Sequence, residues 1–562
     1  MPSVRSEIRR GAYYDSVVLM QLQRGLLALP GVLDTGAVMA TPVNLELLEA
    51  SGLRPSDAPS PDDLLIVVKA ETDAAAGEAL AQVDALLARR RALSEAEFRP
   101  KSLAAAAQQI PAAAWVLISV PGRFAAGVAR EALSLGKNVF LYSDNVPVED
   151  EVQLKRQAAS AGLTVMGPDC GTAIIGGVGF GFANRVRRGS IGLVAASGTG
   201  LQAVTAAIDA LGGGVSQAIG TGGRDLHQEV GGRTALQALD VLRRDPSTNV
   251  IVVISKPPDP EVAGRLVGAA RQTGKPVVFD LIGETGFRGP LGNLHFAAGL
   301  EDAAEIAVSL LSSAPSWPSI PAASSARYLR ALFSGGTLAY ESVLALQYTL
   351  APLSTNVPLR TDQRLNDPLQ SRGHTILDLG ADAFTVGRLH PMIDNDLRLR
   401  RLRQEAGDPE TAVLLLDVVL GEGAHPDPAS ELAPAIADIL QRPGLTVVVV
   451  LVGTADDPQG LDLQRERLAA SGALVLGGLR QALAEVVERL PAGQVDWPSP
   501  VALESFADPK AINVGLETFF ESVVAQGAQA IHVDWRPPAG GDERLMGILA
   551  KMKSTGKTKQ TP

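Results

Sequence analysis

The stretch Gly189–Ala203, with the sequence GSIGLVAASGTGLQA, decides the fold of this chain. Its apolar run at 191–195 predicts a short buried strand, and Ser197–Gly200 turns directly into an apolar helical run at 201–211. A helix that begins on small residues after a strand leaves backbone N–H groups without partners, and its dipole adds partial positive charge there. Such a corner either binds phosphate or carboxylate, or is an ordinary strand–turn–helix connection.

The composition bounds the class of protein. A chain of 562 residues predicts about three to five domains. Its 57 glycines and 46% hydrophobic residues favour α/β domains with parallel sheets. The net charge of -11 argues against a nucleic-acid partner, and the one cysteine, Cys170, argues against disulfides and against a cysteine-rich metal site. Neither a signal-peptide core nor an apolar run of about 20 residues is found, which predicts a cytoplasmic protein with no membrane partner.

The N-terminal part, residues 1–100, is predicted to be a ferredoxin-like α+β domain. Strands are expected at 14–22, 32–41 and 63–70, a helix at 72–91, and an alanine-rich linker at 92–110. This domain holds no set of residues suited to chemistry, so a structural or regulatory role is expected.

Residues 101–188 are predicted to be a partial Rossmann-like domain of alternating strands and helices. Its turn Val120–Arg123 has a single glycine and lacks the GxGxxG spacing of a dinucleotide site. The run Gly167-Pro168-Asp169-Cys170 follows a strand, at the edge of the sheet where ligands bind in open α/β folds. Cys170 is either a packing residue or a nucleophile, and no base lies near it in sequence.

The chain then makes the same corner twice, in segments 189–318 and 325–497. SGTG at 197–200 matches SGGT at 334–337, AIGTGGRD at 218–225 matches DLGADAFT at 378–385, and two further landmarks match in order. Each copy is predicted to be a flavodoxin-like parallel sheet with right-handed crossovers. If the copies pack about a pseudo-two-fold axis, both corners face one cleft and two helix N-termini hold one anion. The alternative is a duplication kept for folding alone.

The residues of this expected anion site come from both corners. They are Ser197, Gly198, Thr199, Gly200, Ser334, Gly335, Gly336 and Thr337.

Several motifs carry a resemblance to a known family. The run at 120–175, which contains GPDCGTAII, together with GSIGLVAASGTGL and RDPSTNVIVVIS, resembles the α subunit of succinyl-CoA synthetase. Residues 327–490 resemble the ligase domain of its β subunit. With its SKPP, LGNLHFA and GRLHPMID motifs, nearly the whole chain resembles the FdrA-type acyl-CoA-synthetase-like proteins. The implied fold is two tandem succinyl-CoA ligase-like domains after a remnant of the CoA domain.

The resemblance implies an acyl-phosphate site at the two corners, with Gly167, Pro168, Asp169 and Cys170 on the substrate side. The best-known assembly of FdrA-type proteins is an oxamate-type carbamoyltransferase of purine degradation. The implied substrates are therefore carbamoyl phosphate, or another phosphate-bearing compound, and a small anionic acceptor.

Departures from the synthetase pattern bear on cofactors and on catalytic residues. A glycine-rich CoA loop and an ATP-grasp domain are both missing from the expected places, which puts CoA and nucleotide binding in question, and no cofactor is assigned. The family's catalytic glutamate is replaced by Ser255-Lys256-Pro257-Pro258. Lys256 is either an oxyanion-stabilising cation or a solvated loop lysine.

Two histidines are further catalytic candidates. His295, in Gly292–Phe296, is the nearest equivalent of the family's active histidine, and His390 lies in Gly387–Asp394. Either is a proton carrier or a structural residue, and His295 is alternatively a phosphate acceptor. Four further residues are substrate-binding candidates. Two flank a glycine-rich strand end, where a capping or loop role is the alternative, and two flank His390. They are Arg224, Asp225, Arg388 and Asp394.

Residues 505–550 are predicted to be a strand–helix unit too small to fold alone, so it docks on this protein or on a partner. Its run INVGLE…HVDWRPPAGGD resembles the start of the large subunit encoded with FdrA-type proteins, which implies a hetero-oligomer, a homo-oligomer or both. Residues 551–562 are predicted to be disordered. Three functions remain open: a carbamoyl- or acyl-transferring subunit, an acyl-CoA synthetase that uses partner sites, and a non-catalytic scaffold.

Overall fold

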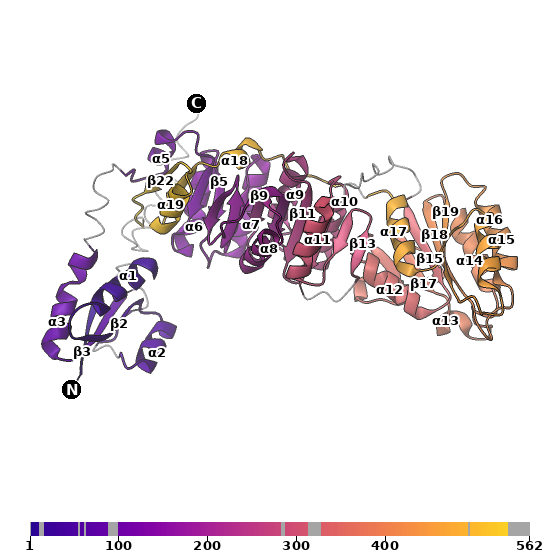
Figure 1. Cartoon of the computed structure of the whole chain (residues 1–562), viewed down its shortest axis with the longest axis horizontal. Coiled ribbons are helices and arrows are strands. Elements are labelled where there is room, and N and C mark those ends of the chain that lie inside the picture. The colour runs from indigo at the N-terminus through magenta and orange to yellow at the C-terminus, as the bar shows by residue number, and fades with distance from the viewer. Residues whose placement is uncertain are drawn as a thin grey trace, which may run out of the picture. The chain divides into compact units, whose positions relative to one another are not determined.

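The computed structural model describes residues 2–10, 16–53, 57–60, 63–87, 99–282, 287–312, 327–492 and 495–537. The chain forms two compact units, one of residues 1–111, 512–520 and 531–562, the other of residues 112–511 and 521–530 (Figure 1). Across these described ranges, no helix combines the length and apolar character that a membrane span requires.

The N-terminal domain is a three-stranded antiparallel sheet in the order β1-β3-β2. Its strands are β1 (Ser3–Arg9), β2 (Val32–Met39) and β3 (Leu64–Ala70), and its helices include α1 (Ser16–Leu27), α2 (Pro42–Ala50) and α3 (Asp73–Ala81). The fold is ferredoxin-like, as expected. The predicted strand at 14–22 is wrong, because residues 16–22 lie in α1. Leu19, Leu22 and Leu26 are buried at intervals of three and four residues, which is the period of a helix rather than a strand.

The part that was expected to be a linker contains helix α5 (Leu103–Gln109), whose N-cap Ser102 accepts a hydrogen bond from the N–H of Ala105 at 3.2 Å. The partial Rossmann-like domain follows, with β4 (Trp115–Ile118), α6 (Gly122–Ser134), β5 (Asn138–Leu141), α7 (Val148–Ser160) and β6 (Val165–Met166). Strands β4, β5 and β6 are parallel neighbours. Their carboxyl ends therefore deliver the loop that begins at Gly167.

The first ligase-like domain is built on an eight-stranded sheet in the order β13-β14-β12-β11-β9-β10-β7-β8. Its strands are β7 (Thr172–Ile175), β8 (Val178–Gly181), β9 (Arg188–Ala195), β10 (Val215–Gly220), β11 (Val250–Ser255), β12 (Val277–Leu281), β13 (Gly289–Leu291) and β14 (Leu294–Phe296). The helices are α8 (Gly198–Ala210), α9 (Arg233–Arg244), α10 (Pro260–Arg271) and α11 (Leu300–Ser312). One core lies between this sheet and the pair α8 and α11, and it includes Leu193, Leu201 and Ile254.

The second ligase-like domain is a six-stranded parallel sheet in the order β16-β17-β15-β18-β19-β20. Its strands are β15 (Tyr328–Phe333), β16 (Leu353–Thr355), β17 (His374–Asp378), β18 (Thr411–Val419), β19 (Thr446–Val452) and β20 (Leu474–Leu476). Its helices are α12 (Gly336–Leu346), α13 (Asp382–Thr385), α14 (Asp396–Gly407), α15 (Pro428–Ile439), α16 (Leu461–Ala470) and α17 (Leu479–Arg489), with a 3-10 turn η1 (Thr361–Gln363).

The two ligase-like domains share one topology. In the first domain, five parallel strands lie in the order β10-β9-β11-β12-β14. In the second domain, the corresponding strands lie in the order β17-β15-β18-β19-β20. Numbered along the chain within each domain, these strands have the same spatial order. This flavodoxin-like order confirms the tandem architecture. The copies also pack together, because Leu291 of β13 lies in the core of the second domain, and the Arg271 guanidinium donates to the carbonyl oxygens of Val487 and Leu490 at 2.7 and 2.9 Å.

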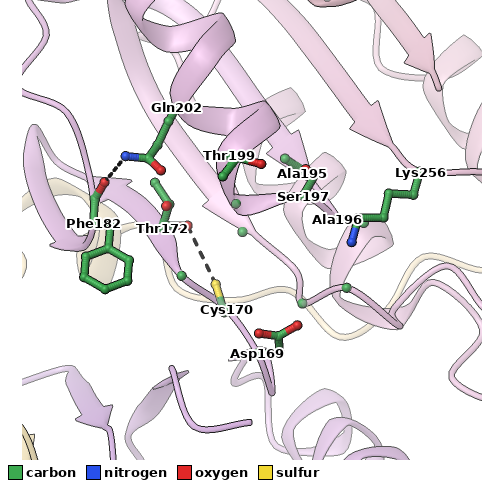
Figure 2. Close-up of a pocket in the computed structure, with 15 residues that line it drawn as sticks. Asp169, Cys170, Thr172, Phe182, Ala195, Ala196, Ser197, Thr199, Gln202 and Lys256 are labelled. Carbon is green, nitrogen blue, oxygen red and sulfur yellow. Dashed lines mark hydrogen bonds between the residues drawn. The ribbon is translucent and has the colours of Figure 1, made fainter. Parts of the chain in front are cut away.

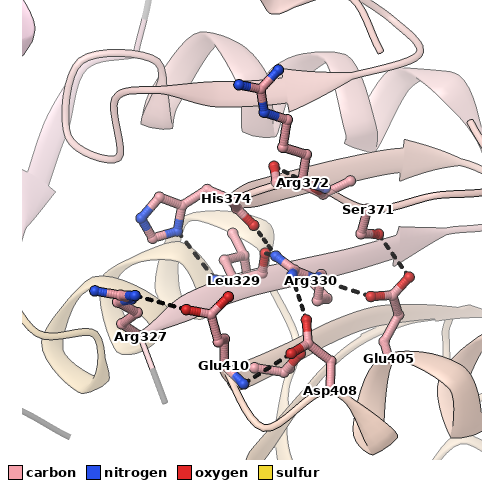
Figure 3. Close-up of polar contacts among 12 residues, drawn as sticks. Arg327, Leu329, Arg330, Ser371, Arg372, His374, Glu405, Asp408 and Glu410 are labelled. Carbon is pink, nitrogen blue, oxygen red and sulfur yellow. Dashed lines mark hydrogen bonds and ion pairs between the residues drawn. The ribbon is translucent and has the colours of Figure 1, made fainter. Parts of the chain in front are cut away.

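A buried ion-pair cluster ties β15 to α14 in the second domain (Figure 3). Arg330 donates to Glu405 at 2.9 Å and to Asp408 at 2.7 Å, and Arg401 pairs with Glu405 at 2.7 Å. Beside it, Nδ1 of His374 accepts a hydrogen bond from the N–H of Leu329 at 3.1 Å. Burial, together with nearby arginines, lowers the pKa of His374 to about 3, so this imidazole is neutral and structural.

The C-terminal elements are α18 (Glu504–Ala507), β21 (Ala511–Val514), α19 (Glu517–Ala525) and β22 (Ala530–Val533). Trp115 of β4 donates its indole N–H to the carbonyl of Ser505 at 2.7 Å and meets the Phe506 ring edge-on at 5.3 Å. The start of the predicted docking unit is therefore anchored on this chain. The tail predicted to be disordered, 551–562, lies outside the described residues.

Candidate functional site

A cavity of about 230 Å³ opens where α8 begins, beyond the carboxyl ends of β9 and β11 (Figure 2). Residues from five separate segments line it. They are Asp169, Cys170, Gly171, Thr172, Phe182, Ala195, Ala196, Ser197, Gly198, Thr199, Gln202, Gly220, Gly222, Gly223 and Lys256.

The first glycine corner supplies the wall of the cavity that attracts anions. Ser197 is the N-cap of α8, and its hydroxyl accepts a hydrogen bond from the N–H of Gly200 at 3.2 Å. The N–H groups of Gly198 and Thr199 stand in the first turn, where no intrahelical acceptor exists. A Cβ on Gly198 would meet only ordinary contacts, the nearest at 3.7 Å, and Gly198 itself lines the cavity, so the cavity reaches this turn. Gly200 itself does not line the cavity, because it packs on Ser197.

Lys256 brings a cation to the same cavity. It follows β11, whose Ile254 is the register partner of Ala195 in β9, so the carboxyl ends of the two strands are neighbours. The side chain is exposed and lines the cavity, and among the described residues its ammonium has neither a hydrogen bond nor an ion pair. An unpaired ammonium beside a helix N-terminus is a suitable arrangement for binding a phosphate or carboxylate.

The loop after β6 forms the opposite wall. Cys170 is 2% exposed, and burial raises the pKa of its thiol to about 12. The thiol is therefore protonated at neutral pH, which supports the packing role rather than the nucleophile. Asp169 lines the cavity, whereas Gly167 and Pro168 only support it. The Pro168 carbonyl approaches so closely that a Cβ on Gly222 would lie 2.4 Å away, and Gly222 has a φ of +87°.

Arg224 and Asp225 do not line the cavity, and the expectation that they bind substrate needs correction. Asp225 is fully buried, pairs with Lys155 at 2.7 Å, and accepts hydrogen bonds from the N–H groups of Thr234 and Ala235 at the start of α9. Arg224 pairs with the buried Glu151 at 2.9 Å. Both charges are used to hold the loop, which is the capping role.

The second glycine corner is built differently, and none of Ser334, Gly335, Gly336 and Thr337 lines the cavity. Ser334 is fully buried, and its N–H and hydroxyl both donate to Asp417, at 2.8 and 2.7 Å. A Cβ on Gly336 would lie 3.0 Å from a carboxylate oxygen of Asp378. The protein's own carboxylates thus occupy the surroundings of this helix start, which disfavours a bound anion there.

His390 belongs to this second corner. A Cβ on Gly380 would lie 2.7 Å from Nε2 of His390, and Nδ1 of the imidazole accepts from the N–H of Met392 at 3.3 Å. Within the described ranges no ion pair joins Arg388 to Asp394, whose carboxylate instead accepts from the N–H of Asp396 at 2.9 Å. The expected cluster of His390, Arg388 and Asp394 around a substrate is therefore not formed.

His295 lies within the sheet rather than at its ligand-binding edge. It is in β14, in register with Val278 of β12, and both β12 and β11 separate β14 from β9. Burial lowers its pKa. His295 does not line the cavity, so the proton-carrier role expected for it is not supported at this site.

Sequence reasoning did not name nine of the lining residues, among them Thr172, Phe182 and Gln202. Thr172 begins β7 and Phe182 follows β8, the two strands of a hairpin in which β7 runs antiparallel to β10. Phe182 meets Tyr142 edge-on at 5.4 Å, and Gln202 donates to the carbonyl of Phe182. A signal was present in the sequence, because Gly176-Gly177 between two apolar runs is the pattern of a two-residue hairpin turn, and both glycines have positive φ.

The turn Val120–Arg123, which lacks the spacing of a dinucleotide site, is closed by the chain itself. A Cβ on Gly122, at the start of α6, would lie 2.2 Å from the carbonyl oxygen of Asp144 and 2.7 Å from that of Asn145. This glycine is thus explained by close backbone packing, and the turn does not fit a phosphate cradle.

Two family models match the chain. Residues 1–102 match the model described as "AllF, heavy metal-associated domain", and residues 332–488 match the model described as "CoA-ligase". The first domain does not fit a soft metal ion, because residues 1–102 contain no cysteine or histidine. Among the described residues, no group of three or more potential metal ligands gathers anywhere.

Relatives and solved structures extend the comparison. Succinate–CoA ligase [ADP-forming] subunit alpha of Methanothermobacter thermautotrophicus is 31% identical over 179 residues, 30% of this chain and 57% of that subunit. The chain thus spans little more than half of that ligase subunit. A structure of the dinucleotide-forming acetyl-coenzyme A synthetase 1 of Ca. Korarchaeum cryptofilum, with phosphate and ADP, covers 67% of this chain and 82% of its own at 19% identity, with a TM-score of 0.29.

A match over nearly the whole chain decides the family. The uncharacterized protein YahF of Escherichia coli strain K12 is 40% identical over 498 residues, which cover 84% of this chain and 96% of YahF. The chain therefore belongs to the FdrA-type family that includes YahF, within the succinyl-CoA synthetase superfamily.

Proposed function

We propose that this chain is the subunit of a carbamoyl- or acyl-transferring enzyme that binds the phosphate of carbamoyl phosphate in the cavity at α8. The observation that carries the proposal is the meeting of an open helix N-terminus at Gly198 with the unpaired ammonium of Lys256. Both features are complementary to a phosphate group. The anion contacts one helix N-terminus in this proposal, since the second corner is occupied by carboxylates.

The transfer balances without a further reactant. A nitrogen of the acceptor, oxamate in the best-known case, attacks the carbonyl carbon of carbamoyl phosphate and forms the new C–N bond. The bond between the carbonyl carbon and the oxygen that bridges it to phosphorus breaks, and phosphate leaves with the electron pair. The acceptor's proton passes to solvent or to the phosphate. Lys256 and the N–H groups of Gly198 and Thr199 stabilise the negative charge as it develops on the leaving phosphate.

The second candidate is an acyl-CoA synthetase that borrows nucleotide and CoA sites from partner subunits. The sequence likeness to an ADP-forming succinate–CoA ligase subunit favours it. That reading needs a phosphoryl acceptor at the cavity if phosphohistidine is formed, and none of the chain's six histidines is among the cavity's lining residues. We therefore rank carbamoyl transfer first.

The test uses the purified full-length chain, alone and with the products of neighbouring genes. Phosphate release from carbamoyl phosphate plus oxamate is the expected activity, and it falls when Lys256 is replaced by glutamine. Incorporation of phosphate from ATP into this chain, followed by acyl-CoA formation, would support the synthetase instead. If the partner proteins release phosphate at the full rate without this chain, the chain is a non-catalytic scaffold.

A further inference from the structure

The cavity is lined by two opposite charges that have no partner in the part of the chain that the structure describes. Lys256, which follows β11, and Asp169, which follows β6, both line the cavity, as Figure 2 shows. Among the described residues, the carboxylate of Asp169 has no hydrogen bond or ion pair, and no ion pair joins it to Lys256. A ligand complementary to this cavity carries an anion toward Lys256 and hydrogen-bond donors toward Asp169.

The backbone of Asp169 is held in a special conformation. Its φ is +55°, in the left-handed region that residues other than glycine seldom adopt, and its N–H donates to the carbonyl of Ser143 at 3.0 Å. Aspartate tolerates this region better than most residues, but still at some cost in conformational energy. The adjacent Cys170 is buried, so the loop is anchored on both sides and places the carboxylate at the cavity.

A carboxylate is a poor neighbour for a simple phosphate, because like charges repel. It is a good neighbour for an amide NH₂ group, because an ionised carboxylate only accepts hydrogen bonds. Carbamoyl phosphate has both features in one small molecule, whereas acetyl phosphate places a methyl group where the carbamoyl NH₂ would be.

We infer that Asp169 is a specificity-determining residue, which makes the cavity prefer an amide-bearing phosphate over an acyl phosphate of the same shape. The inference rests on the proposed function, since it presupposes that the phosphate end binds at Lys256 and α8. It adds to that function a physical reason why the cavity would prefer carbamoyl phosphate to acetyl phosphate.

The experiment is isothermal titration of the full-length chain with three probes: inorganic phosphate, acetyl phosphate and freshly dissolved carbamoyl phosphate. The wild-type chain is expected to bind carbamoyl phosphate about 10-fold more tightly than acetyl phosphate, the effect of one hydrogen bond to a charged group. Asp169→Gly removes the carboxylate without backbone strain, since glycine is at ease at positive φ, and abolishes the preference. Asp169→Asn keeps one acceptor oxygen and retains a smaller preference.

The control is Asn145→Gly, because Asn145 also has a positive φ, of 52°, and does not line the cavity. This variant should keep the full preference. Inorganic phosphate should bind Asp169→Gly as tightly as the wild type or more tightly, because a repelling charge is gone. If the wild type binds acetyl and carbamoyl phosphate equally, the role of Asp169 is refuted and the phosphate site stands. If no probe binds, or if Lys256→Gln binds the probes with wild-type affinity, both the proposed function and the role of Asp169 are refuted.

Discussion

Replacing Lys256 by glutamine is the sharpest test of the phosphate site. An ammonium about 4 Å from a phosphate contributes about 1 kcal/mol in water and about 4 kcal/mol at an effective dielectric constant of 20. Lys256 is exposed, so the value near water applies, and we expect a loss of about 1–2 kcal/mol. That loss corresponds to roughly 5- to 30-fold weaker phosphate binding.

The assay is the dissociation constant of inorganic phosphate, measured by calorimetry at low and at high ionic strength. Because an exposed charge is screened by salt, the difference between the wild type and Lys256→Gln should shrink as salt is added. Lys256→Arg keeps the charge and should retain most of the affinity. Lys101→Gln is the matched control, since Lys101 is also exposed and does not line the cavity. It changes the net charge equally and should leave the affinity unchanged.

The side chain of Lys256 has no partner in the described part of the chain, so its replacement should not alter the thermal midpoint of unfolding. A variant that unfolds at the wild-type temperature and still binds phosphate with wild-type affinity at low salt would refute the assignment. The N-terminus of α8 would then have to bind the anion unaided, or the anion would bind elsewhere.

Three further predictions follow from the geometry. Gly198→Ala should bind phosphate normally, since the new Cβ would meet only ordinary contacts at 3.7 Å or more, whereas Gly198→Leu should fill the cavity and abolish binding in the same titration. His374 has a pKa of about 3 in the folded protein, below its value in the unfolded chain, so protonation favours unfolding. As the pH falls from 7 to 5, the free energy of unfolding of the second domain should therefore fall by about 2 kcal/mol more in the wild type than in His374→Gln. Hydrogen exchange of β15 at each pH measures this difference. Arg330→Met leaves the buried Glu405 without a main partner and should cost about 3–5 kcal/mol in urea unfolding. Arg327→Ala breaks an exposed pair and should leave the urea midpoint nearly unchanged.

Much of the fold could be predicted from local patterns. Alternating apolar strands and amphipathic helices predicted both ligase-like sheets, because the burial of parallel strands leaves continuous runs of Val, Ile and Leu. The errors fall where one local pattern suits two structures. Residues 16–22 are apolar enough for a strand but belong to α1, and β1 was missed because its partly exposed, polar sequence resembles a loop.

The candidate site could be predicted only in part. Six residues named from sequence do line one cavity: Ser197, Gly198, Thr199, Asp169, Cys170 and Lys256. The corner and Lys256 follow β9 and β11, whose carboxyl ends are neighbours in one sheet, whereas Asp169 and Cys170 follow β6 of a separate sheet, so that only the tertiary structure brings the two groups together. Phe182 and Gln202 were not named, since their place depends on a hairpin that runs back along β10.

The amino-acid sequence by itself determined the two tandem sheets and the glycine corner at the start of each first helix, because these depend on residue type and spacing along the chain. Only the tertiary structure decided that the corners differ. At Gly198 the space in front of the helix is open and bordered by Lys256, whereas at Gly336 it is taken by Asp378 and at Ser334 by Asp417. A similar motif can therefore end beside a cavity or as a packed corner, because the side chains around each helix start come from other strands.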